Sequence, residues 1–394
     1  MTPDTHHLMP TYRRSALQFV RGQGAWLETA SGDQYLDFTA GIAVNVLGHA
    51  HPKLVAALTT QAQELWHVSN LFTIKGQGVL ATKLCASADF AERIFFCNSG
   101  AEAVEGTIKS MRKYHAAKGD TDRVNIITFA GAFHGRTLTT LAAGKREYGA
   151  GFGPLPEGFI TCAAFDIEAV AALIDNHTAG ILLEPIQGES GVREVPLAFL
   201  MALRGLCDRH NILLAFDEVQ SGIGRTGKMY AYQWADSEPD IVALAKGLGG
   251  GFPLGAIMAS AAVGDAMQAG SHGSTFGGNP LAMAVGTAVL DEVANPAFLL
   301  HVEKQGGYFH QQLARLLDTY PDILLAVRGR GLMLGLQIKG DLQDFIAALT
   351  REKLLSVGAG DNVVRFVPPL NITQDEIRTA ITAIDAACQT LQNS

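Results

Sequence analysis

Two hydrophobic periods alternate along the middle of the chain. Between residues 94 and 260, short apolar runs bounded by glycine and polar residues alternate with longer segments whose apolar positions recur every three or four residues. The short runs predict buried strands, the longer segments predict helices, and their alternation is typical of a mainly parallel sheet flanked by helices. The expected strands are 94–98, 125–130, 180–184, 212–217, 241–245 and 255–260, and the expected helices lie near 101–117, 167–175 and 196–210.

The two ends of the chain carry different patterns. Near the start, alternation at 19–22 and 26–38 predicts a hairpin with Ser31-Gly32-Asp33 at its turn, and helical periods follow at 53–67 and 76–88. After Asn279 we expect a long helix to about 294, and then helix 300–318, strands near 323–338, helix 341–354, strands at 355–367 and helix 373–391. The expected organisation is an N-terminal arm and small-domain segment at 1–50, a large domain at 51–296, and a C-terminal small domain at 297–394.

Composition narrows the class of protein. Of 394 residues, 48% are hydrophobic and 17% are charged, which favours a large buried core over disorder. The net charge of −8, without a basic stripe, argues against a nucleic-acid partner. Five scattered cysteines without a Cys-x-x-Cys spacing indicate free thiols in a reducing compartment. No signal peptide is visible, and Asp291 and Glu292 interrupt the most apolar window, so we expect a cytoplasmic protein without a membrane span.

A lone lysine ends the apolar run at 241–245. Lys246 is followed by the glycine-rich turn Gly247-Leu248-Gly249-Gly250-Gly251, so we expect it at the carboxyl end of a strand, where open α/β sheets bind ligands. Apolar surroundings favour the neutral amine and lower the pKa of such a lysine, and a neutral amine attacks a carbonyl to form a Schiff base. Taken alone, Lys246 fits an ordinary surface lysine at a strand end better than a catalytic one, because lysines are common at strand ends.

A second strand end is followed by an anion-binding signature. In Asn98-Ser99-Gly100-Ala101-Glu102, Ser99 and Glu102 fit a capping box, and Gly100 allows a ligand to approach the backbone closely. The amides at a helix N-terminus of this kind bind phosphate groups well. The alternative is an ordinary capped helix that binds nothing.

Two further strand ends carry an aromatic ring, an arginine and acids. Phe133 could lie flat on a planar cofactor, and Arg136 could hold a carboxylate bidentately; the alternative is a loop with one surface arginine. The buried run 212–216 ends in Asp217 and Glu218. Because an unpaired buried carboxylate is unfavourable, one acid needs a partner, and a pyridinium nitrogen is suitable.

Three other patterns do not predict a ligand. The segment 222–227 reads Gly-x-Gly-x-x-Gly, but it follows the acidic strand end and no convincing helix follows it, so dinucleotide binding is disfavoured. With Lys228 it also approaches a P-loop, but Met229 stands where Ser or Thr is required to bind magnesium. His49 and His51 lack nearby acids that would complete a metal site, so we expect core or turn roles for both.

A phosphate site, a ring clamp, an acid for a ring nitrogen and a Schiff-base lysine together indicate pyridoxal 5′-phosphate. The chain resembles the class III (ω-amino) aminotransferases of the aspartate-aminotransferase fold from Tyr12 to about Leu370. The motifs that carry the resemblance are Asn-Ser-Gly-Ala-Glu-Ala, Phe-His-Gly-Arg-Thr, Glu-Pro-Ile-Gln-Gly-Glu, Phe-Asp-Glu-Val-Gln, Ala-Lys-Gly, Ser-Thr-Phe-Gly-Gly-Asn-Pro and Arg-Phe-Val-Pro-Pro-Leu. The resemblance implies a fold type I enzyme, with a small α+β domain built from both termini.

The resemblance also implies how the cofactor is held. Lys246 would bind it covalently and then move the proton, Asp217 would keep the ring nitrogen protonated, and Gln220 would bond the phenolic oxygen. The other implied contacts are the amides of Gly100 and Ala101 to the phosphate, Phe133 and Val219 on the two ring faces, and Thr275 reaching the phosphate from the partner subunit. The implied active unit is therefore a homodimer with shared active sites.

The implied substrate contacts are Tyr12, Ser274 and Arg136, the last through the α-carboxylate of the amino donor. Arg365 is the candidate for the carboxylate of glutamate or 2-oxoglutarate, and Glu189 is its candidate cover, with a static structural ion pair as the alternative. Paired with Glu189, Arg365 would tolerate the methylene of an ω-amino substrate; released, it would offer a bidentate fork.

Within the family, the segment 40–45 (Ala-Gly-Ile-Ala-Val-Asn) resembles the branch that acts on acetylornithine. Ornithine aminotransferases tend to carry a tyrosine where Gly41 stands, so an acylated ornithine is favoured, although acetyl, succinyl and succinyl-diaminopimelate substrates share one reacting end. Ornithine or 4-aminobutyrate transfer stays open, and so does a cofactor-dependent aminomutase. A non-catalytic binding protein is disfavoured because Lys246 is present.

Overall fold

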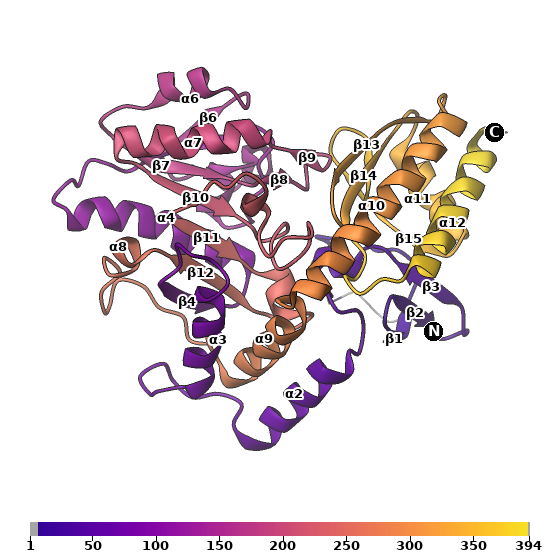
Figure 1. Ribbon diagram of the computed structural model, residues 1–394, viewed down its shortest axis with the longest axis horizontal. Helices are drawn as coiled ribbons and strands as arrows, with labels where there is room; N and C mark the ends of the chain where they lie inside the picture. Colours follow the sequence, from indigo (N-terminus) through magenta and orange to yellow (C-terminus); the bar gives the residue numbers. More distant parts are fainter. Residues whose placement is uncertain (1–6, 393–394) are drawn as a thin grey trace.

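The computed structural model describes residues 7–392 and divides them between a larger and a smaller part (Figure 1). The larger part is built on a seven-stranded sheet in the order β4-β12-β11-β10-β7-β5-β6. Its strands are β4 (Arg93–Cys97), β5 (Asn125–Phe129), β6 (Phe159–Cys162), β7 (Thr178–Leu183), β10 (Leu213–Asp217), β11 (Ile241–Leu244) and β12 (Gly255–Ala259). All neighbours pair in parallel except β12, which runs antiparallel between β11 and β4.

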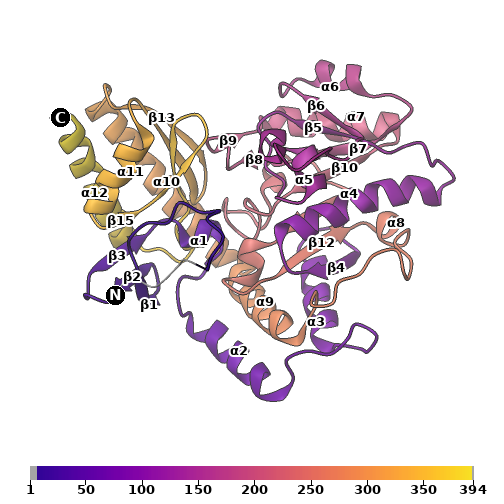
Figure 2. The same ribbon diagram turned by 180° about the vertical axis from the view of Figure 1, so that it is seen from behind.

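Apolar residues on alternate positions of the strands bury both faces of this sheet. In β10, Leu214 and Phe216 join the core cluster that contains Leu203 of α7 (Leu197–His210), whereas Leu213 and Ala215 join the cluster that contains Ile108 of α4 (Gly100–Ala117). Figure 2 shows α4 in front of the sheet on the side opposite α7. The other helices of this part are α2 (Pro52–Glu64), α3 (Lys75–Cys85), α5 (Leu138–Ala143), α6 (Ile167–Leu173), α8 (Ala261–Gly264), α9 (Pro280–Val293), and the short η1 (Arg146–Gly149), η2 (Ala231–Trp234) and η3 (Lys246–Gly249).

The smaller part combines the two ends of the chain. Its antiparallel sheet has the order β13-β14-β17-β16, and a second sheet has the order β1-β2-β3-β15. Because β3 and β15 pair in parallel, with Leu36 opposite Leu354, the N-terminal strands belong to the same unit as the C-terminal helices (Figure 1). The elements are β1 (Phe19–Gln23), β2 (Trp26–Thr29), β3 (Gln34–Asp37), α1 (Ala40–Ala43), α10 (Pro296–Thr319), β13 (Leu324–Arg330), β14 (Met333–Ile338), α11 (Leu342–Arg351), β15 (Leu354–Leu355), β16 (Val357–Ala359), β17 (Val363–Phe366) and α12 (Gln374–Gln392).

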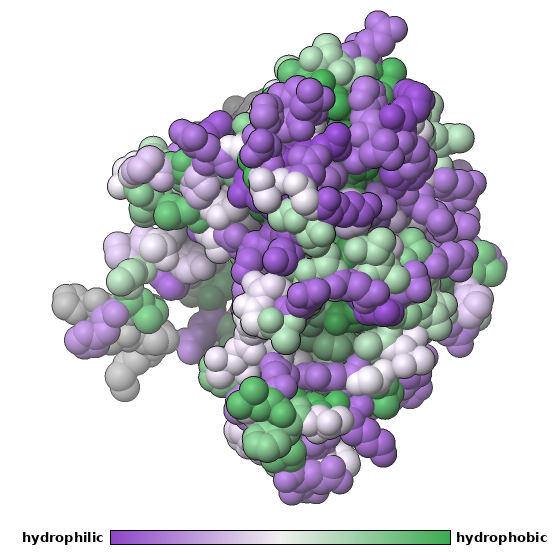
Figure 3. Space-filling view, turned by 90° about the vertical axis from the view of Figure 1, so that its left-hand side faces the viewer, coloured by the Kyte–Doolittle hydropathy of each residue, from purple (hydrophilic) through white to green (hydrophobic). Residues whose placement is uncertain are grey.

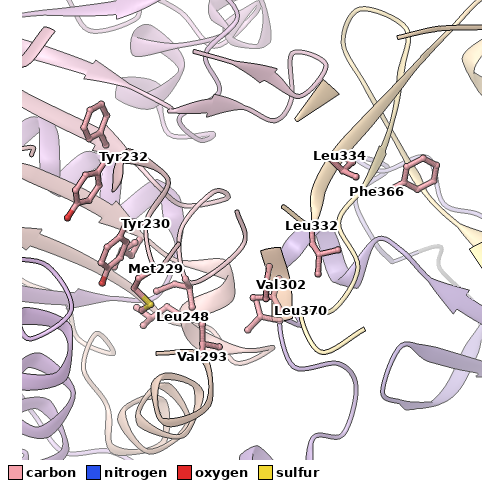
Figure 4. Close-up of a cluster of buried hydrophobic side chains, with 14 of the residues drawn as sticks. Met229, Tyr230, Tyr232, Leu248, Val293, Val302, Leu332, Leu334, Phe366 and Leu370 are labelled. Carbon is pink, nitrogen blue, oxygen red and sulfur yellow. The ribbon is translucent and has the colours of Figure 1, made fainter. Parts of the chain in front are cut away.

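One buried cluster continues from the larger part into the smaller one. Figure 4 shows Leu248 and Val293 on the side of the large sheet and Val302, Leu332 and Leu370 on the side of the small part, all members of that cluster. The buried Arg225 adds polar bonds across the same boundary, since its Nη1 donates to Leu332 O at 3.0 Å and to Pro368 O at 2.5 Å. These contacts hold the small part over one edge of the large sheet.

The architecture expected from the sequence is confirmed. Each expected strand of the large sheet is present within two residues, and α4 and α7 match their predicted ranges closely. The expected hairpin is a three-stranded meander, because β1, β2 and β3 pair in sequence. The helix expected at 300–318 begins earlier, at Pro296, because Asn295 caps it by accepting a bond from the amide of Ala297. The short strand β6 and the pair β8 (Ile186–Gln187) and β9 (Arg193–Glu194) were not expected.

All five cysteines lie in the described part of the chain; each is free, and four are buried. From residue 7 to residue 392, no single helix is long and apolar enough to cross a membrane, and α9 and α10 pass that test only as a pair bent by 70°.

Candidate active site

The strand order brings the predicted chemical residues to one edge of the large sheet. β11, β10, β7 and β5 are neighbours and run in parallel, so the residues that follow them meet at the carboxyl edge. Lys246 follows β11, Asp217 ends β10, Glu184 follows β7, and Phe133 lies in the loop after β5. β4 also ends at this edge, because two successive antiparallel pairings return it to the direction of β11.

A cavity of about 440 Å³ opens at this edge. The predicted residues that line it are Gly100, Ala101, Phe133, Arg136, Asp217, Val219, Gln220 and Lys246. Tyr12, Glu189, Ser274, Thr275 and Arg365 do not line it in the described single chain. The cavity therefore gathers every residue assigned to the cofactor except Thr275, which the resemblance assigns to the partner subunit.

Lys246 occupies a strained turn at the end of β11. Its φ of 41° is left-handed, a conformation that a residue with a side chain rarely adopts outside functional or tight-turn sites. Burial lowers the pKa of its amine to about 8, and the nearby Arg365 charge acts in the same direction. Glu189, Asp217 and Glu184 oppose this shift without cancelling it. At neutral pH the neutral, nucleophilic form of Lys246 is therefore much more populated than in an exposed lysine.

Asp217 points into the cavity and is held by two donors. The ring Nδ1 of the buried His134 lies 2.7 Å from Asp217 Oδ2, and the amide of Val219 donates to Oδ1 at 3.0 Å. The next residue, Glu218, faces away from the cavity, as alternation along a strand requires, and accepts bonds from Ser221 Oγ and the amide of Tyr232. Of these two adjacent acids, Asp217 is therefore the one placed to bind a ring nitrogen in the cavity.

Glu184 is a buried acid of the cavity to which the sequence analysis gave no role. It accepts a bond from the amide of Phe133 at 2.9 Å. Burial, followed by the charge of Asp217, raises the pKa of Glu184 well above its usual value. Its sequence signal is the one that identified Asp217, a polar residue directly after a fully buried strand, and His134 was likewise within a quoted motif without a role.

The N-terminus of α4 forms the predicted cradle. Ser99 caps the helix by accepting from the amide of Glu102 at 3.3 Å. The Glu102 carboxylate accepts from the amide of Asn98 and the hydroxyl of Ser99, not from the amide of Ser99, so the predicted capping box is only half present. The first amides of a helix have no intrahelical partner, so those of Gly100 and Ala101 are available to an anion. A Cβ on Gly100 would lie 2.7 Å from Val219 Cγ1, which explains why glycine is needed there.

Arg365 and Glu189 form the expected ion pair beside the cavity. Arg365 Nη1 lies 2.7 Å from Glu189 Oε1 and 2.9 Å from Gln220 Oε1, which connects the pair to a residue of the cavity wall. Burial alone would raise the pKa of Glu189, but the Arg365 charge and hydrogen bond outweigh it and lower that pKa. The contact is present; whether it opens during the reaction stays a prediction.

The remaining predicted substrate residues lie at the rim or outside it. Ser274 accepts from Asn98 Nδ2 at 3.2 Å, which places it next to the mouth of the cavity. Thr275 and Tyr12 are exposed, and Arg14 stacks on the Tyr12 ring at 5.5 Å. Neither Tyr12 nor Thr275 lines the cavity in the described single chain, so their assigned roles stay predictions.

The segment 40–45 forms an unusual wall. Ala40, Gly41, Ile42 and Ala43 all have positive φ, from 44° to 65°, so the chain makes a left-handed turn there. Asp37 supports it by accepting from the amides of Thr39 and Ala40. Val44, directly after the turn, lines the cavity.

The patterns that were set aside have structural roles. The segment 222–227 is a series of turns whose Arg225 bonds the small part, and η2 after it is a short 3₁₀ turn rather than a phosphate-binding helix. His49 Nε2 lies 2.8 Å from Asp37 Oδ2. Over residues 7–392, no group of three His, Cys, Asp or Glu side chains is arranged to hold a metal ion.

Comparisons with known proteins give one consistent result. A family model described as Aminotransferase class-III matches residues 9–388. The chain is 54% identical over 389 residues to acetylornithine aminotransferase 1 of Bradyrhizobium diazoefficiens, with 98% of this chain and 96% of that protein covered. It matches the N-acetylornithine aminotransferase structure from Stenotrophomonas maltophilia with a TM-score of 0.84 at 38% identity, covering 97% and 98% of the two chains. The ornithine aminotransferase from Toxoplasma gondii ME49 gives a TM-score of 0.94 at 33% identity, covering 99% and 94%.

Proposed function

The chain belongs to the class III aminotransferases, and from this premise we propose that it transfers the terminal amino group of N2-acetyl-L-ornithine to 2-oxoglutarate. The products are N-acetyl-L-glutamate 5-semialdehyde and L-glutamate, a step of arginine biosynthesis. The observation that carries the proposal is the position of Lys246, a lysine with a lowered pKa that lines one cavity together with Asp217, Gly100 and Ala101. Relatives that share about half of the sequence over nearly its whole length support the choice of substrate.

The enzyme depends on pyridoxal 5′-phosphate, and the cavity fits that group. The α4 amides suit its phosphate, the Asp217 carboxylate suits its ring nitrogen, and Gly100 adds no Cβ beside Val219 at this end of the cavity. Phe133 and Val219 would enclose the ring, and Gln220 would donate to its phenolic oxygen. When bound, the cofactor supplies an electron sink for the carbon that loses its proton.

The side chains of the cavity then have separate tasks. The Nζ of Lys246 would hold the cofactor and would afterwards take a proton from the reacting carbon and return one, a task that its lowered pKa permits near neutral pH. His134 fixes the orientation of Asp217 through the 2.7 Å contact. Arg136 and Ser274 would hold the donor's carboxylate end, and Arg365 would be released from Glu189 when glutamate or 2-oxoglutarate binds.

A substrate panel tests the proposal. N-acetylornithine, succinylornithine, ornithine and 4-aminobutyrate are each supplied to the holoenzyme with 2-oxoglutarate, and glutamate formation is measured. We expect the largest kcat/KM with N-acetylornithine. Ornithine is the second candidate, because the ornithine aminotransferase from Toxoplasma gondii has the TM-score of 0.94; a preference for free ornithine would contradict the proposal. Product formation without 2-oxoglutarate would indicate an aminomutase.

We further propose that the active unit is a homodimer with shared sites. Large apolar side chains are exposed along the loop between α2 and α3 and near Thr275, namely Leu65, Trp66, Leu71, Phe72 and Phe276. Asn70 of that loop donates to Ser274 O and Gly277 O, so the loop and the Thr275 segment form one continuous surface. Figure 3 shows hydrophobic side chains gathered at the lower end of one face, and contiguous exposed apolar surface of this kind marks protein interfaces.

The free thiols favour a reducing compartment, so we propose a cytoplasmic location.

A further inference from the structure

Arg136 has an unusual environment for a residue assigned to carboxylate binding. It lines the cavity and is exposed, and over residues 7–392 its guanidinium makes neither a hydrogen bond nor an ion pair. Instead it stacks on aromatic rings: its Cζ lies 4.3 Å from the ring centre of Tyr148 and 5.6 Å from that of Phe133. The side chain is therefore held by contacts that leave its N–H donors unused.

Tyr148 also carries a second cation. It lies on η1, directly after α5, with 41% of its surface exposed, and Lys145 Nζ lies 5.6 Å from the centre of its ring. Lys145 is anchored in turn by the backbone oxygen of Glu189, to which Nζ donates at 3.4 Å. The ring of Tyr148 thus contacts two cations, Arg136, which lines the cavity, and Lys145.

No acid among the described residues pairs with these two cations. The carboxylate of Glu189 is directed at Arg365 at 2.7 Å, and Lys145 reaches only the backbone of that residue. Two positive side chains that share one ring, without a counter-charge, favour an anion beside them.

We propose that Tyr148 is a positioning residue for Arg136 and that, with Lys145, it shapes the subsite for the substrate carboxylate remote from the reacting carbon. This inference rests on the proposed function and extends it. In N-acetylornithine three carbons separate the reacting carbon from that carboxylate, and in 2-oxoglutarate two carbons do.

The difference of one carbon explains why stacking suits this position. An arginine fixed by directional hydrogen bonds to a protein carboxylate would meet one of the two carboxylates well and the other poorly. A guanidinium that lies on an aromatic face can move along that face while keeping most of the attraction, because the interaction has little directional preference in the ring plane. Tyr148 therefore lets Arg136 serve both substrates of the reaction.

Steady-state kinetics of the holoenzyme test the proposal with Tyr148→Ala, Tyr148→Phe and the matched control Tyr114→Ala. Tyr114 carries the same kind of contact, with Lys118 Nζ at 4.0 Å from its ring, but it does not line the cavity. In Tyr148→Ala we expect KM for N-acetylornithine and for 2-oxoglutarate to rise together by roughly 3- to 30-fold, with kcat within about twofold. Tyr148→Phe keeps the ring and should stay near wild type, and so should Tyr114→Ala.

Two further measurements distinguish a loss of carboxylate positioning from a general disturbance of the active-site structure. Glutarate, which has two carboxylates and no reacting group, should inhibit Tyr148→Ala less, with a Ki raised by a similar factor. N-acetyl-1,4-diaminobutane is the donor without its carboxylate, and its KM and kcat should be the same in Tyr148→Ala as in the wild-type enzyme. Lys145→Met should raise the glutarate Ki most at low salt, because its contribution is electrostatic.

The outcomes are distinguishable. The positioning role would be overturned if KM and the glutarate Ki were unchanged in Tyr148→Ala. It would also be overturned if KM rose by the same factor for the donor that lacks a carboxylate as for N-acetylornithine. If the wild-type enzyme does not use N-acetylornithine, the proposed function fails, and the glutarate Ki measured with whichever donor is active still tests Tyr148.

Discussion

Replacing Glu189 by Ala removes the cover of Arg365. In the structure Arg365 is fully buried, and its Nη1 bonds Glu189 at 2.7 Å and Gln220 at 2.9 Å. Its Nε and Nη2 atoms have no partner within residues 7–392. In Glu189→Ala the arginine keeps Gln220 as its hydrogen-bond partner and no longer has a carboxylate partner.

The magnitude follows from the contact that is lost. A hydrogen bond between charged groups contributes about 1.5–3 kcal/mol, which corresponds to roughly a 10- to 100-fold change in an equilibrium. A carboxylate substrate no longer has to displace Glu189, so the half-reaction with glutamate should hold or improve. N-acetylornithine places a methylene beside the uncovered arginine, so its half-reaction should slow. We expect the ratio of the two rates to shift by about one to two orders of magnitude.

Single-turnover absorbance spectra of the holoenzyme, mixed separately with each amino donor, measure the two rates. The matched control is Glu194→Ala, because Glu194 pairs with Arg330 at 3.1 Å in the neighbouring strand β9 without contacting Arg365. The control should leave the ratio unchanged. Equal slowing of both half-reactions in Glu189→Ala, or a loss confined to glutamate, would refute the switch and indicate a static ion pair.

Three further predictions concern other residues. Asp217→Ala should lower turnover by about 10²–10³-fold in a steady-state assay, because a preorganised charge is removed and Glu218 faces away; near-normal turnover would refute this. Mixing Lys246→Ala and Thr275→Ala subunits should restore activity through heterodimers with one intact site, and no gain after confirmed subunit exchange would count against shared sites. Burial raises the pKa of Glu218 to about 7 from its usual 4.5, so its contribution to stability is present below pH 4.5 and is lost as pH rises through 7. The free energy of unfolding, measured in urea at pH 4.5 and at pH 7, should fall by about 3 kcal/mol over this range because of Glu218, and Glu218→Gln should remove that fall. An unchanged pH dependence of the unfolding free energy in Glu218→Gln would contradict this assignment.

The local pattern of apolar residues was sufficient to predict most strands of the large sheet. Buried runs such as 241–244 leave few alternatives to a strand, and the residues directly after such runs, Lys246 and Asp217, were found because parallel strands place their carboxyl ends together. Glu184 follows the same rule after β7, and so it was accessible to the same reasoning but was not assigned a role.

Other features depend on contacts that no local pattern encodes. The stacking of Arg136 on Tyr148 joins two loops, and the left-handed φ of Lys246 is imposed by the tight turn into η3. The pairing of β3 with β15 connects segments more than 300 residues apart, so its register could not be derived from either segment alone. The domain boundaries at 50 and 296 and the individual ligand contacts stay predictions.

Borohydride reduction of the holoenzyme, followed by peptide mapping, tests the central claim most directly. Reduction should fix the cofactor irreversibly to one lysine, and we predict that this lysine is Lys246, with the Lys246→Ala protein binding cofactor reversibly and remaining unlabelled. Lys145, whose Nζ lies 5.6 Å from the centre of the Tyr148 ring, provides an internal comparison and should carry no label. A label on Lys145 or any other residue, or no label in protein that is catalytically active, would contradict the account.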